Sequence, residues 1–139
     1  MNLSNNNFSG KIPNPSAKFT NCPEIDMSFN HFKGPVSHFL FEVAALHLFC
    51  NRFSKLNAIR DFNNDSPLSF LDISSNQLFV ELPDCWMRFK ELQVLLLANN
   101  ELLGKIPISI GSLTQIKTLH LGNDNLSAQL PSSLKHSET

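Results

Sequence analysis

The chain has 139 residues, 42% of them hydrophobic, and a formal net charge of −1. This composition is typical of a folded soluble domain and excludes a disordered chain, and the 11 scattered basic residues argue against a nucleic-acid-binding surface. The N-terminal segment lacks the basic and apolar stretches of a signal peptide, and the most apolar window, residues 39–49, is too short to cross a membrane.

The chain repeats itself. Six segments that open with alternating apolar and polar residues begin at Met1, Ile25, Leu46, Leu71, Leu95 and Leu119. The sixth residues of these segments lie 24, 21, 25, 24 and 24 positions apart, and they are Asn6, Asn30, Asn51, Asn76, Asn100 and Asp124. A fixed period of this length predicts a solenoid, in which each repeat buries its apolar face against its neighbours.

The opening of each repeat predicts a short strand with one buried face, and the strands of successive repeats should stack into a parallel sheet. The Asn that follows is expected to turn the chain and point inward, where its amide bonds backbone groups that no strand partner satisfies. These side chains would form a ladder along the solenoid. Asp124 keeps the acceptor of the Asn side chain and lacks its NH₂ donor, so this rung should be weaker.

The second half of each repeat brings the chain back. An apolar residue is often followed by Gly and then by Leu-Pro or Ile-Pro, which favours an extended segment. Apolar residues then recur about every third position, which predicts short 3₁₀ turns; they are Trp86, Phe89, Leu92 and Leu95 in one repeat and Ile110, Leu113, Ile116 and Leu119 in the next.

The third repeat, which starts at Leu46, lacks both the Gly and the Pro. We therefore expect one array over residues 1–139 with about six repeats, incomplete at both ends and irregular around residues 38–70. Because no capping segment is evident at either end, both terminal cross-sections should expose apolar surface, and the isolated chain should be marginally soluble or self-associate.

The repeat resembles the leucine-rich repeat of the plant extracellular type, LxxLxxLxLxxNxLxGxIP. The segments LPDCW (82–86) and GKIPISIGSLTQIKTLHL (104–121) resemble plant receptor-like proteins and receptor-like kinases. The resemblance implies an α/β solenoid, a right-handed superhelix with a short parallel sheet on its concave face and a 3₁₀ or irregular convex side. It also implies a parent protein at the plasma membrane, with its repeats outside the cell, that binds a peptide, glycan or protein ligand together with a co-receptor.

In such a solenoid the outward residues of the sheet and the adjoining turns are the candidate ligand contacts. These are Asp26, Phe29, His31, His47, Phe49, Arg52, Asp72, Gln77, Leu96, Asn99, Glu101 and His120. Phe29, Phe49 and Leu96 are apolar where solvent is expected. Either they form a contact patch, or the rings fold over the irregular third repeat.

Catalysis has little support in the sequence, which carries no HExxH, GxSxG, P-loop or dinucleotide-binding motif. His47 and His120 occupy the same strand position three repeats apart, about 14 Å at ~4.8 Å per strand, and cannot share a metal ion. We expect no cofactor and no enzyme activity. Two alternatives to a receptor segment are a secreted inhibitor similar to polygalacturonase-inhibiting proteins and a truncated gene product without a function of its own.

Three Asn residues in N-x-S triplets are candidate glycosylation sites if the parent protein is secreted: Asn7, Asn64 and Asn125. Asn64 lies in the long loop 63–67 and is the best candidate, whereas Asn2, also in a triplet, falls on a strand. Cys22, Cys50 and Cys85 are an odd number. They are either three free thiols or one disulfide and a single thiol.

Overall fold

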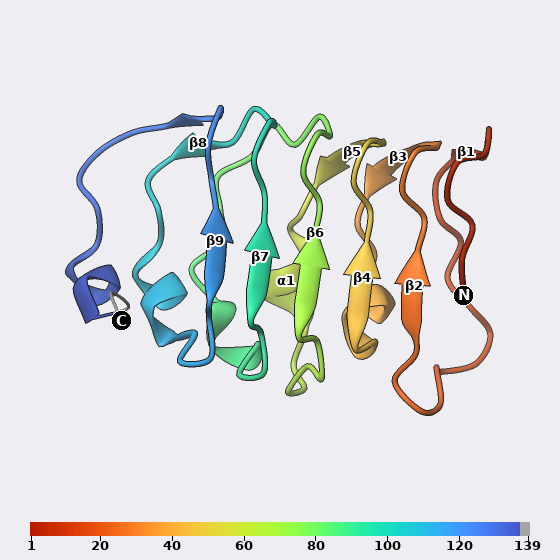
Figure 1. Ribbon diagram of the computed structural model, residues 1–139, viewed down its shortest axis with the longest axis horizontal. Helices are drawn as coiled ribbons and strands as arrows, with labels where there is room; N and C mark the ends of the chain where they lie inside the picture. Colours follow the sequence, from red (N-terminus) through yellow and green to blue (C-terminus); the bar gives the residue numbers. More distant parts are fainter. Residues whose placement is uncertain (137–139) are drawn as a thin grey trace.

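The computed structural model describes residues 1–136, which form a coil with one turn per repeat. The strands lie side by side as a five-stranded parallel sheet, seen face-on in Figure 1. In spatial order they are β2 (Glu24–Asp26), β4 (Ala45–His47), β6 (Phe70–Asp72), β7 (Val94–Leu96) and β9 (Thr118–His120). The first repeat adds an isolated bridge between Asn2 and Asp26. Each strand begins one residue before the apolar position at which the repeat was expected to open.

The register of the sheet aligns the apolar positions of all five repeats. Ile25, Leu46, Leu71, Leu95 and Leu119 are successive partners, and the first four are fully buried. The apolar residues two positions later, Met27, Leu48, Ile73 and Leu97, are buried as well. One face of the sheet therefore forms a continuous wall of the core, and the other faces solvent.

A second set of short parallel strands follows the ladder residues and was not foreseen from the sequence. β1 (Ser9–Gly10), β3 (His31–Pro35) and β5 (Arg52–Lys55) form one sheet, and β8 (Leu103–Gly104) pairs with β10 (Asn125–Leu126). Between them the pairing is interrupted and resumes at a bridge between Glu81 and Leu103.

The interruption falls in the fourth repeat, where Val80 stands in the place of glycine; Lys55, which replaces the glycine of the third repeat, still pairs with Pro35. Gly10, Gly34 and Gly104 adopt positive φ angles of 86°, 83° and 72°. The equivalent residues in the third and fourth repeats are Lys55 and Val80, and neither adopts a positive φ. A β-branched residue such as Val is strongly disfavoured at positive φ, so the fourth repeat bends differently and drops out of the second sheet.

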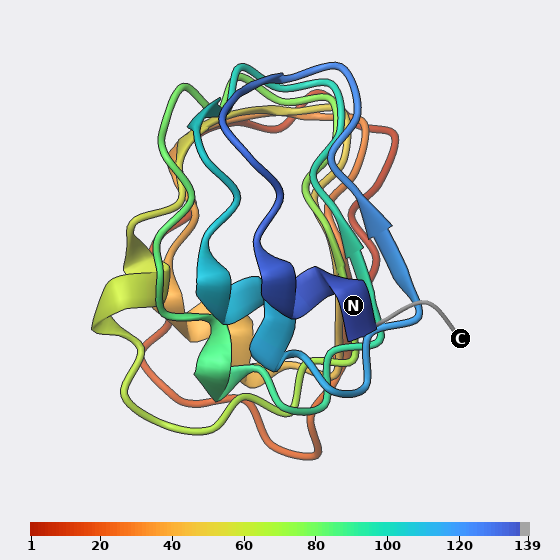
Figure 2. The ribbon, with the colours of Figure 1, turned by 90° about the vertical axis from the view of Figure 1, so that its left-hand side faces the viewer.

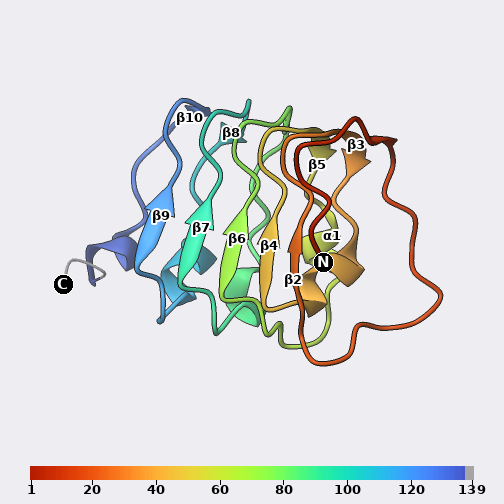
Figure 3. The same ribbon diagram turned by 45° about the vertical axis from the view of Figure 1, so that its right-hand side comes forward.

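The return limbs carry short helical turns on the side of each coil away from the five-stranded sheet (Figure 2). They are η1 (His38–Glu42), α1 (Ala58–Asp61), η2 (Trp86–Arg88), η3 (Ile108–Ser112) and η4 (Ser132–His136). The three-residue spacing of apolar side chains is confirmed, because Trp86, Phe89, Leu92 and Leu95 are all fully buried. In the first repeat the return limb has no helical turn, and the connection between β1 and β2 bulges from the stack (Figure 3).

The irregular third repeat is filled with aromatic rings. Phe41, Phe62 and Phe89 lie with ring centroids 5.4–6.0 Å apart and pack largely edge to face. The loop after α1 is fixed by Ser66, which is buried. Its hydroxyl donates to the carbonyl of Phe41 at 2.5 Å and its N–H donates to the carbonyl of Arg88 at 2.8 Å. The third repeat, which lacks the Gly and Pro of the motif, is thus held by aromatic packing and by the hydrogen bonds of one buried serine.

Candidate ligand-binding face

The ladder residues fasten each repeat to the one before it. The Asn76 amide donates to the carbonyl of Ile73 in its own repeat at 3.1 Å and to that of Leu48 in the preceding repeat at 3.0 Å. Its Oδ1 accepts the N–H of Phe53, again in the preceding repeat, at 2.9 Å. The same set of bonds is made by Asn30, Asn51 and Asn100. Asn6 donates within its own repeat, to Leu3 and Ser4.

The last rung differs from the others. Oδ1 of Asp124 accepts the N–H groups of Asn100 and Leu102 at 3.2 Å each. Its Oδ2 is buried and has no hydrogen-bond partner among the described residues. Burial raises the pKa of Asp124 above its ordinary value of 3.8, and the two backbone hydrogen bonds only partly oppose this. The carboxylate therefore occupies a position built for an amide.

The residue before each ladder position has a left-handed backbone. Its φ lies between 52° and 58° in all six repeats, at Asn5, Phe29, Cys50, Ser75, Asn99 and Asn123. Asn tolerates this conformation better than other non-glycine residues, for which it costs about 1–2 kcal/mol. The conformation directs these side chains outward: Phe29 is 46% exposed, and the amide of Asn123 donates to Oδ1 of Asn99 at 2.9 Å.

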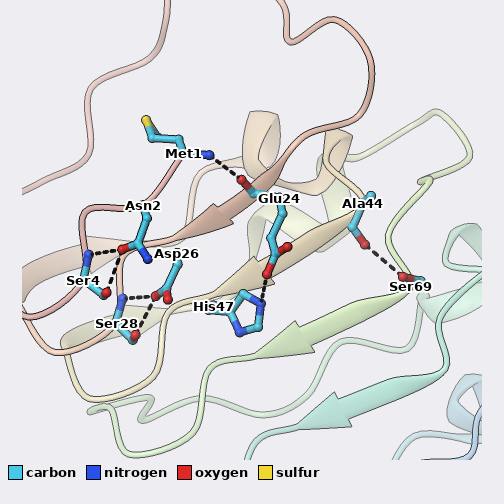
Figure 4. A network of polar contacts seen from close by, with 9 residues as sticks. All are labelled: Met1, Asn2, Ser4, Glu24, Asp26, Ser28, Ala44, His47 and Ser69. Atoms are coloured by element: carbon cyan, nitrogen blue, oxygen red, sulfur yellow. Dashed lines mark hydrogen bonds and ion pairs between the residues drawn. The ribbon is translucent and has the colours of Figure 1, made fainter.

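Two carboxylates on the solvent side of the sheet also shape the backbone. Oδ1 of Asp26 accepts both the N–H and the hydroxyl of Ser28, at 2.9 and 2.5 Å. Asp72 binds Ser74 in the same way, also at 2.9 and 2.5 Å. Asn2 makes the equivalent bonds to Ser4 at 2.8 and 2.6 Å, so the turn needs an oxygen acceptor and not a charge (Figure 4).

A row of outward residues that the sequence interpretation missed lies at the start of the strands. It contains Glu24, Ala45, Phe70, Val94 and Thr118, which are successive partners in the sheet. The repeat motif opens at the first buried apolar residue of each strand, so it does not include the outward residue that precedes it. The signal was available, because a strand with one buried face extends to the polar side of that leucine as well.

His47 lies on this face in β4, the second of the five strands. Its Nε2 is 3.0 Å from Oε1 of Glu24, and its ring centroid is 4.6 Å from that of Phe70 (Figure 4 draws the pair with Glu24). The register places Asp26 and Asp72 on the two strands that flank it. Three carboxylates therefore lie on the two strands beside His47, and only that of Glu24 pairs with the ring; among the described residues neither Asp26 nor Asp72 forms an ion pair.

The two predicted outward rings contact one another. The centroids of Phe29 and Phe49 are 4.6 Å apart and their planes meet at 76°, an edge-to-face arrangement. Phe29 is half exposed and Phe49 partly exposed. Phe49, Phe70, Val94 and Leu96 are absent from the buried core and from the partly buried side chains that pack on it. They lie on the solvent side of the sheet, so the rings form a surface patch there.

The remaining candidate contacts are more scattered. Asn99 and His120 are exposed beside the C-terminal strands. Four others are exposed but follow the ladder residues and lie outside the five-stranded sheet: His31, Arg52, Gln77 and Glu101. His31 is in β3 and Arg52 is in β5, both strands of the second sheet. Counting along the repeat could not separate these groups, because the second sheet was not anticipated.

The candidate glycosylation sites Asn7, Asn64 and Asn125 are all exposed. Cys22, Cys50 and Cys85 are free thiols, and burial raises the pKa of the Cys85 thiol. In the part of the chain that the structure describes, no three His, Cys, Asp or Glu side chains come together in a way that could hold a metal ion. Over residues 1–136 there is also no helix long and apolar enough to span a membrane.

The coil, the parallel sheet and the Asn ladder define a class. The family model for the Leucine Rich Repeat matches residues 1–19, 67–89 and 91–113. The chain is a leucine-rich repeat protein of the plant extracellular type, an α/β solenoid with its short parallel sheet on the concave face.

Its relatives carry receptor names. The chain is 35% identical over 95 residues to Receptor-like protein EIX2 of Solanum lycopersicum, a match that covers 68% of this chain and 9% of that protein. It is 33% identical over 103 residues to Receptor-like protein 18 of Arabidopsis thaliana, covering 71% of this chain and 12% of that protein. The chain thus spans about a tenth of the length of these curated relatives.

Solved structures agree with this assignment. The ectodomain of the Arabidopsis thaliana membrane receptor kinase GASSHO1/SCHENGEN3, in complex with CASPARIAN STRIP INTEGRITY FACTOR 2, superposes with a TM-score of 0.72 at 26% identity. That match covers 92% of this chain and 16% of the ectodomain chain. The Arabidopsis receptor kinase HAESA, in complex with the peptide hormone IDA and the co-receptor SERK1, gives 0.62 at 28% identity and covers 99% of this chain and 27% of its own.

Proposed function

We propose that the chain is a non-catalytic, ligand-binding segment of a plant cell-surface receptor-like protein or kinase that acts in defence or developmental signalling. The observation that carries the proposal is the solvent side of the five-stranded sheet. It holds partly exposed Phe49, Phe70, Val94 and Leu96 together with Asp26 and Asp72, and such a mixture of apolar and charged groups is typical of a recognition surface.

The parent protein would lie at the plasma membrane with these repeats outside the cell. The relatives named as receptor-like proteins support this, as do the three exposed candidate glycosylation sites. The ligand would be captured on the sheet face, and a co-receptor would then join the complex. The HAESA complex, which contains both a peptide hormone and a co-receptor, is the precedent among proteins of similar fold.

A matched pair of substitutions tests the location of the site. Ala98 is partly exposed two residues after Leu96, just beyond the end of β7, and Met87 is 49% exposed on the opposite side of the coil. The wild-type chain, Ala98→Gln and Met87→Gln would be immobilised and probed with short anionic, neutral and cationic peptides and with cell-wall oligosaccharides. We expect Ala98→Gln, whose larger neutral side chain obstructs the face, to lose the bound probe and Met87→Gln to keep it. Equal binding by all three chains, or no binding of any probe, would refute the proposal.

A further inference from the structure

The apolar side chains of the sheet face form a strip that stays partly exposed among residues 1–136. Phe70 in β6 and Val94 and Leu96 in β7 are partly exposed and lie outside the core, and Phe49 follows β4 on the same side. The edge-to-face contact of Phe49 with Phe29 extends this strip toward the N-terminal repeats. A strip of this kind across neighbouring strands is a surface that an extended partner can lie on.

The charge of the same face is one-sided. The outward residues of the five strands include Glu24, Asp26 and Asp72, and no Lys or Arg occupies the two outward positions of any strand. Within the described residues, the only ion-pair partner of these three carboxylates is His47, which pairs with Glu24. Asp26 and Asp72 lie on the strands that flank β4, so a cation above His47 would reach both.

We propose that the ligand of this face is an extended peptide segment carrying a basic residue followed, three positions later, by an apolar residue. The inference rests on the proposed ligand-binding function and names the chemistry of the ligand. The basic group would lie over β4 between Asp26 and Asp72, and the apolar side chain would pack on Leu96. Phe70, whose ring already contacts His47, offers an aromatic face beside the cation.

The spacing follows from sheet geometry. β4 and β7 are separated by one strand, β6, so they are two strand spacings apart, which is roughly 9.6 Å at about 4.8 Å per spacing. A peptide in the extended polyproline II conformation advances about 3.1 Å per residue with three residues per turn. Side chains three positions apart therefore lie on the same side of the peptide and span the distance between β4 and β7. A neutral oligosaccharide would leave Asp26 and Asp72 without an ion-pair partner, so the charge of the face favours the basic peptide, and binding of the oligosaccharide becomes an outcome of the test.

The probes are fluorescein-labelled decapeptides of Gly and Ser that contain one Arg and one Leu at separations of one to five positions. Matched peptides replace Arg by Glu or by Ser, and a labelled cell-wall hexasaccharide serves as the carbohydrate probe. Binding to the full 139-residue chain is measured by fluorescence anisotropy at 0.1 M and 1 M salt.

The first repeat supplies the design of the protein variants. Because Asn2 makes the same two hydrogen bonds as Asp26 and Asp72, the double variant Asp26→Asn/Asp72→Asn removes the charge and keeps the turn. Circular dichroism verifies that its fold is unchanged. Asp61→Asn is the matched control, because Asp61 is an exposed carboxylate at the end of α1, outside the five-stranded sheet and outside the candidate contacts.

We expect the three-position Arg–Leu peptide to bind tightest among the separations. The double variant should weaken binding of that peptide about tenfold at 0.1 M salt, with little difference left at 1 M, while Asp61→Asn leaves binding unchanged. Leu96→Ala should weaken it several-fold and remove the preference for the three-position separation.

Equal binding by the double variant, or preference for the Glu peptide or the hexasaccharide, would overturn the inference. If such a probe nevertheless lost its binding in Ala98→Gln, the proposed function would survive the loss of this inference. If no probe of any class bound, both would fall.

Discussion

Replacing Asp124 by Asn should stabilise the fold by completing the ladder. In the register of the ladder, an amide at this position would donate to the carbonyls of Leu97 and Leu121. Asn100 donates in that way to Ile73 and Leu97, at 3.0 and 2.9 Å. Each such bond contributes about 1 kcal/mol net, and the substitution also removes a buried carboxylate oxygen without a partner. We expect a gain of about 1–2 kcal/mol at pH 7.

The gain should depend on pH in a defined direction. Burial raises the pKa of Asp124 in the folded chain, so the folded state favours the protonated carboxyl. The stability that this group contributes is fully present below pH 3.8 and is lost as the pH rises through the folded-state pKa. The advantage of Asp124→Asn is therefore largest at neutral pH and shrinks toward pH 3.8 and below.

Urea unfolding followed by circular dichroism at pH 7 and pH 3.5 measures both effects, and repeating it at two protein concentrations separates self-association from folding. A comparison variant, Asp84→Asn, should show the opposite trend with pH. The N–H of Ser109 donates to Asp84 at 2.9 Å and lowers the pKa of that carboxyl, so its contribution is present above pH 3.8 and fades as the pH falls. An Asp124→Asn chain no more stable than wild type at pH 7, or one whose advantage grew on acidification, would refute the reasoning.

Three further substitutions probe the backbone and the ladder. Ala128 has a φ of 68°, so Ala128→Gly should stabilise the chain by about 0.5–1 kcal/mol in the same urea assay, and a loss of stability would contradict the strain assigned there. A side chain on Gly111 would overlap Ser133, so Gly111→Ala should speed hydrogen exchange in residues 131–136 while β2 stays protected; unchanged exchange would count against close packing of η3 on η4. Asn76→Asp should remove the two amide hydrogen bonds in the middle of the ladder and bury a carboxylate there, which lowers the free energy of unfolding by about 3 kcal/mol. A loss of less than about 1 kcal/mol would contradict this prediction.

Most of the fold could be predicted from the repeat period in the sequence. Because the Asn positions recur at a nearly constant spacing, the strands, the inward Asn side chains and the three-residue spacing of Trp86 and Phe89 could all be placed before the structure was available. These features depend on side-chain type, which the sequence prints directly. The pair Asp-x-Ser also recurs at Asp26 and Asp72, but the sequence analysis did not predict the side-chain-to-backbone turns that these residues form.

Backbone conformation was harder to predict. The left-handed position before each ladder residue is held by Asn in three repeats but by Phe29, Cys50 and Ser75 in the others, so no shared residue type marks it. The same limit hid the second sheet. Its strands depend on the φ of residues such as Gly34, and its interruption depends on Val80, whose effect appears only once the neighbouring strands are in place.

The inter-repeat bonds of the ladder all run in one direction. Every rung from Asn30 to Asp124 bonds the repeat that precedes it, through its acceptor oxygen in each case and through its amide wherever the rung is Asn. The inter-repeat hydrogen bonds of these side chains therefore need only the preceding repeat and not the following one. A ribosome releases the chain in this same order, so each new coil can lock onto a finished one as it emerges. The solenoid can thus be assembled during synthesis, with each new repeat packing and bonding on the folded repeat that precedes it.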